Sequence, residues 1–209
     1  QEVPEPELAA GEVTVEVHAT ALNRADLSQR HGRYPPPPGA SEILGLEVAG
    51  TVAQLGPGVD GWEIGQRVAA LLPGGGYAER VNVPAGMLMP VPDSLTLEEA
   101  AGVPETFLTA YSALFNEGAL QRGETVLLHA GASGVGTSAI QMAARAGTTV
   151  LTTAGSDEKT AFCASLGASL AVNYRKEDFA ERIAAQQPGG VDLVIDPVGR
   201  DYFERNLRL

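Results

Sequence analysis

The stretch from Glu124 to Ala144 constrains the fold more than any other part of the chain, because an apolar run breaks at glycines and then resumes with helical spacing. Val126, Leu127 and Leu128 form a continuous apolar run, which is typical of a parallel strand covered on both faces. Further along, apolar or small residues recur at helical intervals at Ile140, Ala143, Ala144 and Gly147. The pattern predicts a strand, a tight turn and a helix.

The turn between this strand and helix has the glycine spacing of a loop that binds the phosphates of a dinucleotide. Gly131 and Gly136 fill the outer positions, and Ser133, followed by Gly134, stands in the middle. In such loops glycines allow the turn, the approach of backbone to pyrophosphate and the close packing of helix on strand. A helix opening at Val135 would add free backbone N–H groups and a positive dipole end. A glycine-rich turn without a ligand is the alternative interpretation.

The next predicted strand, residues 149–153, bears on which dinucleotide the loop would take. It should end beside the adenosine ribose, where an NAD site requires a carboxylate. The nearest acids, Asp157 and Glu158, fall within the following helix instead. Ser156 and Lys159 offer a hydroxyl and an ammonium group to a 2′-phosphate, which favours NADPH over NADH. The alternative is that Ser156 only caps the helix while Lys159 is solvated.

Composition argues against several classes of function. The 209 residues are 44% hydrophobic and 19% charged, which fits a soluble globular chain long enough for two modest domains. The 26 acidic and 14 basic residues give a net charge of −12, which would repel nucleic acid. No apolar run approaches the roughly 20 residues of a membrane span, and no signal-peptide pattern is present. We therefore expect a cytoplasmic protein with no nucleic-acid or membrane partner.

The cysteine content excludes thiol-based structures. Cys163 is the single cysteine, so neither a disulfide within the chain nor a zinc site built from several thiolates can form. Because Phe162 and Leu166 flank it in a helical pattern, we expect Cys163 to be a buried, small apolar residue.

The first 90 residues predict a small β-barrel or sandwich, because short strands alternate with glycine and proline turns. The predicted strands lie in residues 11–22, 44–55, 66–72 and 77–83. A short helix capped by Asn23 and stopped by Gly32 would follow the first strand. Tyr34 and the four prolines after it would form a stiff, extended segment.

The remainder predicts an α/β domain. Thr96 and Glu99 have capping-box spacing, and Pro104 opens a second helical run. After the glycine loop, strands and helices alternate strictly, at residues 149–153, 157–166, 170–173, 177–186 and 192–196. This order predicts a doubly wound parallel sheet. The full dinucleotide fold has six strands, so we expect its second half, and the first strand of the β-rich domain, to lie outside this chain. The predicted domains are residues 1–95 and 96–209.

Six motifs, in this order, resemble those of the medium-chain dehydrogenases and reductases, and within them the zinc-independent quinone oxidoreductase branch. They are Asn23-Arg-Ala-Asp26, Gly32-x-Tyr34, Pro36-Pro-Pro-Gly39, Gly45-Leu-Glu47-x-x-Gly50, Leu108-Thr109-Ala110 and Ala130-Gly-Ala-Ser-Gly-Val-Gly136. The resemblance covers nearly the whole chain. It implies an α/β protein in which a β-rich, GroES-like barrel domain precedes a doubly wound Rossmann domain.

The chain departs from the zinc-containing branch at two positions. Alcohol dehydrogenases of that branch have a cysteine near the position of Asn23 and a histidine before the glutamate, where this chain has Leu46 before Glu47. Since a catalytic zinc needs three Cys, His or carboxylate ligands, we expect no metal. Glu47 would remain as a structural carboxylate.

The resemblance also implies a role for individual residues. Asn23 and Thr109 would face the nicotinamide, and Asp26 and Tyr34 would border the substrate cleft, so that Asn23, Asp26 and Tyr34 are the candidate catalytic residues. The proposed pyrophosphate contacts are Ser133, Gly134 and Val135, and the proposed 2′-phosphate contacts are Gly155, Ser156, Lys159 and Tyr174. Ordinary structural roles are the alternatives: Asn23 as a cap, Asp26 on a helix surface, Tyr34 packed under the prolines, and Tyr174 closing a strand. For His129 we expect packing at a strand end.

The implied activity is NADPH-dependent reduction of quinones without a metal. A quinone needs no strong general acid, because its reduced form is a stabilised phenolate that water can protonate. One alternative is reduction of activated carbon–carbon double bonds in enals or enones, and another is NADPH binding without catalysis, as in crystallin relatives. The expected partners are a small-molecule quinone or enone, and further copies of the chain in a homodimer or homotetramer.

Overall fold

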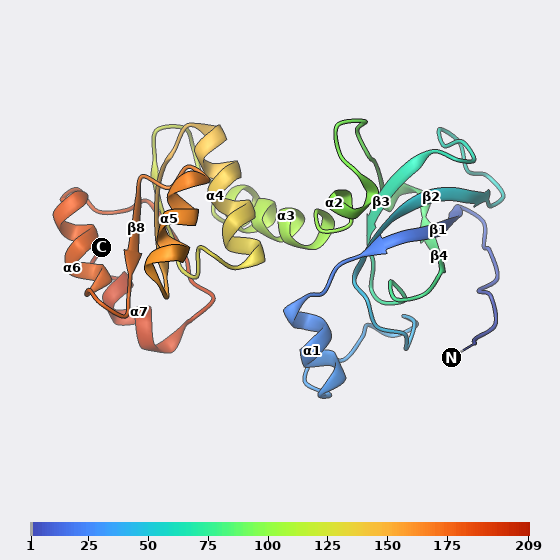
Figure 1. The fold of residues 1–209 in the computed structure, drawn as a ribbon, viewed down its shortest axis with the longest axis horizontal. Helices are drawn as coiled ribbons and strands as arrows, with labels where there is room; N and C mark the ends of the chain where they lie inside the picture. Colours follow the sequence, from blue (N-terminus) through green and yellow to red (C-terminus); the bar gives the residue numbers. More distant parts are fainter. Residues whose placement is uncertain (1) are drawn as a thin grey trace. The chain divides into compact units, whose positions relative to one another are not determined.

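The computed structural model describes residues 2–209 and divides the chain into two compact units. The first unit ends at Glu105, and the second runs from Thr106 to Leu209. The division falls in the first turn of helix α3 (Pro104–Tyr111) (Figure 1). No helix among residues 2–209 is both long enough and apolar enough to cross a membrane.

The first unit is built on an antiparallel sheet. Its strands are β1 (Glu12–Thr20), β2 (Glu47–Leu55), β3 (Arg67–Leu71), β4 (Arg80–Pro84) and β5 (Leu88–Pro90), in the order β4-β1-β2-β3-β5. Alternation along these strands directs one set of side chains into a core that includes Val13, Val15, Val48, Val52 and Val68. The β-rich domain expected from the sequence is confirmed.

One predicted strand begins later than expected. β4 starts at Arg80, and before it only the Glu79 carbonyl bonds to the sheet, where it accepts from the Val17 N–H at 2.8 Å. The reason is a loop contact, because the Tyr77 backbone N–H donates to the Leu44 carbonyl and the Gly75 N–H donates to that of Ile43. These bonds hold residues 75–77 against the segment that enters β2.

Short helices complete the first unit. Helix α1 (Arg24–Arg30) follows Asn23, and α2 (Leu97–Ala100) follows Thr96, with a 3₁₀ turn at Ala85–Met87. The capping box is confirmed, since the Glu99 N–H donates to Thr96 Oγ1 at 3.1 Å and the Thr96 N–H donates to Glu99 Oε2 at 2.8 Å.

The second unit is a parallel sheet with helices on both faces. Its strands are β6 (Thr125–Leu128), β7 (Thr149–Ala154), β8 (Leu170–Asn173) and β9 (Leu193–Ile195), in the order β8-β7-β6-β9. This is the order of the first four strands of a Rossmann fold. The helices are α4 (Gly134–Ala146), α5 (Asp157–Ser165), α6 (Phe179–Gln186) and α7 (Arg200–Asn206). The predicted doubly wound arrangement is therefore confirmed.

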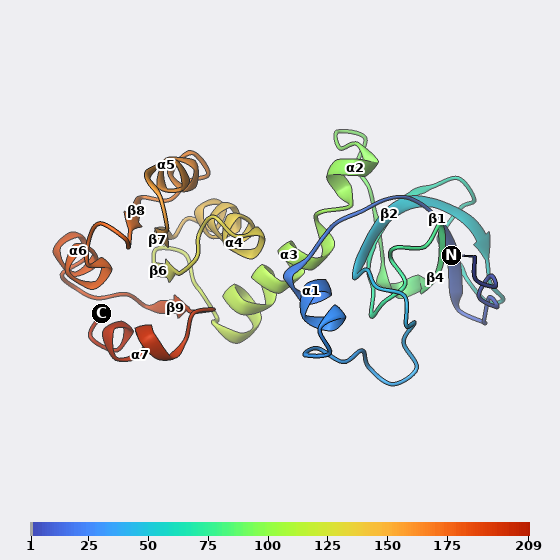
Figure 2. The same ribbon diagram turned by 60° about the horizontal axis from the view of Figure 1, so that its bottom comes forward.

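Two apolar layers sandwich this sheet. Figure 2 shows α4 and α5 on one face and α6 and α7 on the other. Ile140, Ala143 and Cys163 pack in the first layer, and Phe179 and Ile183 pack in the second. Cys163 is fully buried, and burial raises the pKa of its thiol, as expected of a residue used for packing.

Candidate dinucleotide-binding site

The glycine loop between β6 and α4 is held close to the neighbouring strand β7. The Gly131 N–H donates to the Thr153 carbonyl at 2.9 Å. A Cβ on Gly131 would lie 2.0 Å from Thr152 Oγ1, and one on Gly136 would lie 2.4 Å from the Ala130 carbonyl oxygen. Both glycines are therefore required by close packing. The left-handed residue of the turn is Ala130, with φ of 56°, so Gly131 serves the packing while its neighbour makes the turn.

Beyond the turn, the loop presents unpaired donors at the start of a 13-residue helix. Ser133 is the N-cap of α4, and its Oγ accepts from the Gly136 N–H at 3.0 Å. Within residues 2–209 no acceptor is found for the N–H groups of Gly134 and Val135. Ser133 and Gly134 are both exposed. Free N–H groups and a positive dipole end at one exposed point form a site suited to an anion such as a phosphate.

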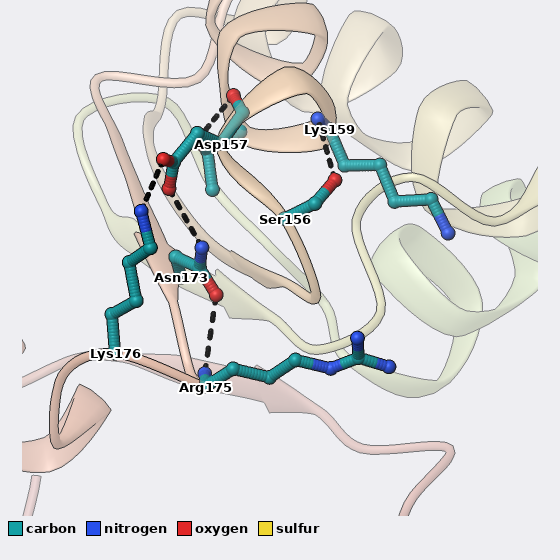
Figure 3. A network of polar contacts seen from close by, with 7 residues as sticks. Ser156, Asp157, Lys159, Asn173, Arg175 and Lys176 are labelled. Atoms are coloured by element: carbon teal, nitrogen blue, oxygen red, sulfur yellow. Dashed lines mark hydrogen bonds and ion pairs between the residues drawn. The ribbon is translucent and has the colours of Figure 1, made fainter.

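A second polar site lies where β7 ends. Ser156 caps α5, because its Oγ accepts from the Lys159 N–H at 3.3 Å, so the capping role considered from sequence is present. In Figure 3 the side chains of Lys159 and Arg175 extend in the same direction, away from Asp157, and Ser156 lies beside the first part of the Lys159 side chain. Both cations are exposed, and neither forms an ion pair with any described residue. An uncompensated pair of cations next to a hydroxyl group is suited to a phosphate monoester.

The end of β8 brings Tyr174 and Arg175 to the same place. A Cβ on Gly155 would lie 2.8 Å from the Tyr174 hydroxyl and 3.6 Å from Arg175 Nε, so Gly155 leaves the space that these two side chains border. The sequence already places the Arg175 guanidinium beside the Tyr174 phenol, because the two residues are adjacent at the carboxyl end of a parallel strand. Only Tyr174 is among the predicted 2′-phosphate contacts.

One of the two acids nearest to the expected ribose position, Asp157, is engaged by other side chains. Asn173 Nδ2 donates to Asp157 Oδ1 at 2.7 Å, and Lys176 Nζ lies 2.5 Å from Asp157 Oδ2 (Figure 3). The contact with Lys176, and next that with Asn173, holds the pKa of Asp157 below its usual range. Asn173 Oδ1 also accepts from the Arg175 N–H at 3.1 Å. Sequence reasoning missed this network, because its members are 16 and 19 residues apart.

His129 has the packing role expected of it. It is buried directly after β6, where its ring packs against the rings of Phe179 and Tyr202, which also pack against each other. Asn206 uses Nδ2 to donate to Asp196, so its Oδ1 must accept from His129 Nε2 at 2.9 Å. His129 Nδ1 then accepts from the Thr153 hydroxyl at 3.0 Å. The imidazole is fixed as the neutral Nε2–H form, and burial lowers its pKa.

In the first unit, three of the polar residues singled out by the sequence come together. Asn23 Nδ2 donates to Glu47 Oε1 at 2.7 Å, and the Asn23 N–H donates to Asp26 Oδ2 at 2.7 Å. Glu47 is 1% exposed, and its second oxygen accepts from the Glu105 N–H at 2.9 Å. Burial raises the pKa of Glu47, although these two hydrogen bonds oppose that shift.

Asp26 is not on a helix surface. It is 4% exposed, and its Oδ1 is buried without a hydrogen-bond partner among the described residues. Burial, together with the nearby carboxylates of Asp26 and Glu47, raises the pKa of Tyr77 to about 12. The Tyr77 phenol is therefore protonated at neutral pH and can act only as a neutral donor or acceptor.

Two further predicted residues take no part in the hydrogen bonds given for this cluster. Tyr34 is 51% exposed, and no hydrogen bond joins it to Asn23 or Asp26 in the part of the chain described. Thr109 is exposed on α3 and belongs to the second unit, with the glycine loop.

The fold and the glycine loop are those of a class of two-domain proteins that bind dinucleotides. A β-rich unit is followed by a parallel α/β unit whose first strand, glycine loop and helix form a candidate anion site. Residues 9–93 match the family model for the alcohol dehydrogenase GroES-like domain, and residues 134–209 match that for zinc-binding dehydrogenases. Together the two matches take in more than half of the chain.

Known proteins of this kind resemble the chain along nearly its whole length. A quinone oxidoreductase of Thermus thermophilus, whose structure was also solved in complex with NADPH, is 42% identical with a TM-score of 0.83 over 98% of this chain. The CurK enoyl reductase is 34% identical with a TM-score of 0.88 over the full chain. A low-reducing polyketide synthase of Aspergillus calidoustus is 37% identical over an alignment of 209 positions, which covers 98% of this chain.

The chain belongs to the medium-chain dehydrogenase/reductase superfamily, in its quinone-oxidoreductase-like branch. It spans 64% of the Thermus structure, 65% of the CurK structure and 9% of the polyketide synthase.

The contacts of Glu47 lead to a prediction about stability. Glu47→Leu leaves the Asn23 amide and the Glu105 N–H without an acceptor, and we expect the free energy of unfolding to fall by about 1 to 3 kcal/mol. Glu47→Gln should cost less, because Asn23 can turn its amide and accept from the new amide nitrogen. Urea denaturation measures both variants. A leucine variant as stable as the wild type would contradict the role given to these hydrogen bonds.

The burial of His129 leads to a prediction about pH. Because its pKa in the folded protein lies below the ordinary 6.5, the unfolded chain takes up a proton that the folded chain resists as pH falls below 6.5. The wild type should therefore lose more unfolding free energy between pH 7.5 and pH 5.5 than His129→Gln does. His31→Gln, at an exposed histidine, is the matched control. Equal losses in the wild type and His129→Gln would refute the prediction.

Proposed function

We propose that the chain is the cofactor-binding part of an NADPH-dependent reductase. The single observation that carries the proposal is the charge arrangement after β7 and β8. Lys159 and Arg175 are unpaired cations that extend to the same side of Ser156, whereas Asp157, at the start of α5, is bonded to Lys176 and Asn173 (Figure 3). This arrangement fits the 2′-phosphate of NADPH better than the free 2′-hydroxyl of NADH.

Two groups of residues would hold the cofactor in the second unit. The pyrophosphate is assigned to the N–H groups of Gly134 and Val135 and to the Ser133 hydroxyl, whose proton is free because its oxygen accepts from Gly136. The 2′-phosphate is assigned to Ser156, Lys159, Tyr174 and Arg175, with Gly155 leaving the necessary space.

The nicotinamide end is assigned to Asn23 and Thr109. A carboxylate can only accept hydrogen bonds, so Glu47 holds the Nδ2 group of Asn23 toward itself. The Oδ1 atom of Asn23 is then left to accept a hydrogen bond from the carboxamide of the nicotinamide. Asp26 and Tyr34 are proposed to border the acceptor cleft. When bound, NADPH supplies the hydride, and the residues of this chain bind and orient it.

The acceptor that we propose is a quinone. The proposal rests on the family branch and on the likeness to the quinone oxidoreductase of Thermus thermophilus. A second candidate is an activated carbon–carbon double bond, which the likeness to the CurK enoyl reductase and to the polyketide synthase favours. Assembly as a homodimer or homotetramer remains part of the proposal.

Cofactor preference tests the assignment of the phosphate site. We expect Lys159→Ala and Arg175→Ala each to raise the Kd for NADPH by about tenfold, equivalent to about 1.4 kcal/mol, and to leave the Kd for NADH nearly unchanged. Arg145→Ala removes an exposed cation from the last turn of α4, so it controls for a general change of charge. Fluorescence titration gives the Kd of the wild type and of each variant for both nucleotides. If Lys159→Ala and Arg175→Ala raise the Kd for NADPH and for NADH equally, these cations do not bind the 2′-phosphate.

Acceptor turnover tests the reaction. With NADPH in excess, the protein should reduce a simple benzoquinone faster than an enal such as a 2-alkenal of similar size, and the loss of NADPH absorbance measures both rates. Turnover of the enal alone would select double-bond reduction. Tight NADPH binding with no turnover of either acceptor would select a binding protein without catalysis.

A further inference from the structure

Asp157 is next to the proposed phosphate site and yet does not oppose it. It directly follows Ser156, and an exposed carboxylate at this point would repel a 2′-phosphate and could accept a hydrogen bond from a ribose 2′-hydroxyl. In the structure both of its carboxylate oxygens are engaged, Oδ1 by Asn173 at 2.7 Å and Oδ2 by Lys176 at 2.5 Å.

The contacts of Asp157 keep a neutral ion pair on one side of Ser156 and two unpaired cations on the other. Figure 3 shows Asp157 and Lys176 on one side of Ser156, and the ends of the Lys159 and Arg175 side chains on the other. The Lys176–Asp157 pair carries no net charge, so Asp157 adds little repulsion toward an anion bound by the two unpaired cations. Lys176 is the only lysine of the chain besides Lys159, and it is used to neutralise this acid.

Asn173 contacts both Asp157 and the backbone of Arg175. It is 8% exposed at the end of β8, so its side chain is fixed by the sheet. Its Nδ2 holds Asp157, and its Oδ1 accepts from the backbone N–H of Arg175 at 3.1 Å. A single side chain therefore holds the acid on one side and fixes the backbone of a proposed phosphate ligand on the other.

We propose that Lys176 and Asn173 are specificity-determining residues that keep Asp157 from selecting NADH. They act through Asp157 and are positioning residues, because neither is assigned a contact with the nucleotide. The inference rests on the NADPH site proposed above. A helix-stabilising role of Asp157 at the start of α5 would not distinguish one nucleotide from the other, so the ratio of the two Kd values isolates the proposed role.

The test is a double-mutant cycle with Lys176→Ala and Asp157→Asn, read out as the Kd ratio of NADH to NADPH by fluorescence titration. In the otherwise wild-type protein, Lys176→Ala should lower this ratio by about two- to fivefold, the size expected of an exposed ion pair. In the Asp157→Asn background the same substitution should change the ratio much less, because no acid remains to be released.

Two controls test whether the change in the Kd ratio comes from the charge of Lys176. Arg182→Ala breaks another exposed ion pair of the second unit, with Glu177, and should leave the ratio unchanged. Titrations at about 0.01 M and about 0.1 M salt, where the Debye length is about 30 and 10 Å, should show the effect of Lys176→Ala shrinking as salt rises.

The outcomes separate this inference from the proposed function. If the wild type prefers NADPH and Lys176→Ala changes the ratio equally in both backgrounds, Lys176 acts on the nucleotide directly and the inference is overturned. No change in either background also overturns it. If the wild type shows no preference for NADPH, the proposed site itself fails, whatever the variants do.

Discussion

The close packing of the glycine loop against β7 is the contact on which the second unit depends. Gly131 leaves no room for a side chain against Thr152, and Gly136 leaves none against the Ala130 carbonyl. This closeness aims the first turn of α4, with its free N–H groups, out from the carboxyl end of the sheet. Thr153, the next residue of β7, also accepts from Gly131 and donates to His129, so one strand fixes both the loop and the residue that precedes it. The anion site is thus a consequence of backbone proximity.

Charged side chains next to the loop then decide which nicotinamide nucleotide the candidate site favours. The loop offers only neutral donors and a dipole, which suit the pyrophosphate of either nicotinamide nucleotide. Discrimination requires charged side chains at the ends of β7 and β8, where Lys159 and Arg175 are unpaired and Asp157 is paired with Lys176. In a chain with a net charge of −12, unpaired cations beside a neutralised acid are a local exception to the overall acidity. The long-range field of the protein opposes an anionic ligand, so the site depends on short contacts.

The first unit uses buried carboxylates to fix a polar side chain. Glu47 accepts from Asn23 and from the Glu105 backbone, and Asp26 accepts from the Asn23 backbone. Desolvation makes these acids costly unless donors surround them. The cluster gives Asn23 a defined amide orientation that an exposed asparagine would lack. Zinc-containing relatives are expected to have a thiolate near this position, so an amide held by a carboxylate is a different solution to placing a polar group there.

The sequence by itself determined the order of the elements, the β-rich and doubly wound architecture, the glycine loop and the family, because these depend on periodicity and on short motifs such as Thr96 with Glu99. Four of the residues that it proposed for the cofactor, Asn23, Ser133, Ser156 and Lys159, lie next to turns and caps that local patterns reveal. Only the tertiary structure decided that Ala130 makes the left-handed turn, that residues 77–79 leave the strand, that Asp26 is buried, and that Asp157 is held by Asn173 and Lys176. Each of these depends on contacts between residues distant in sequence, whose free energies no local pattern encodes.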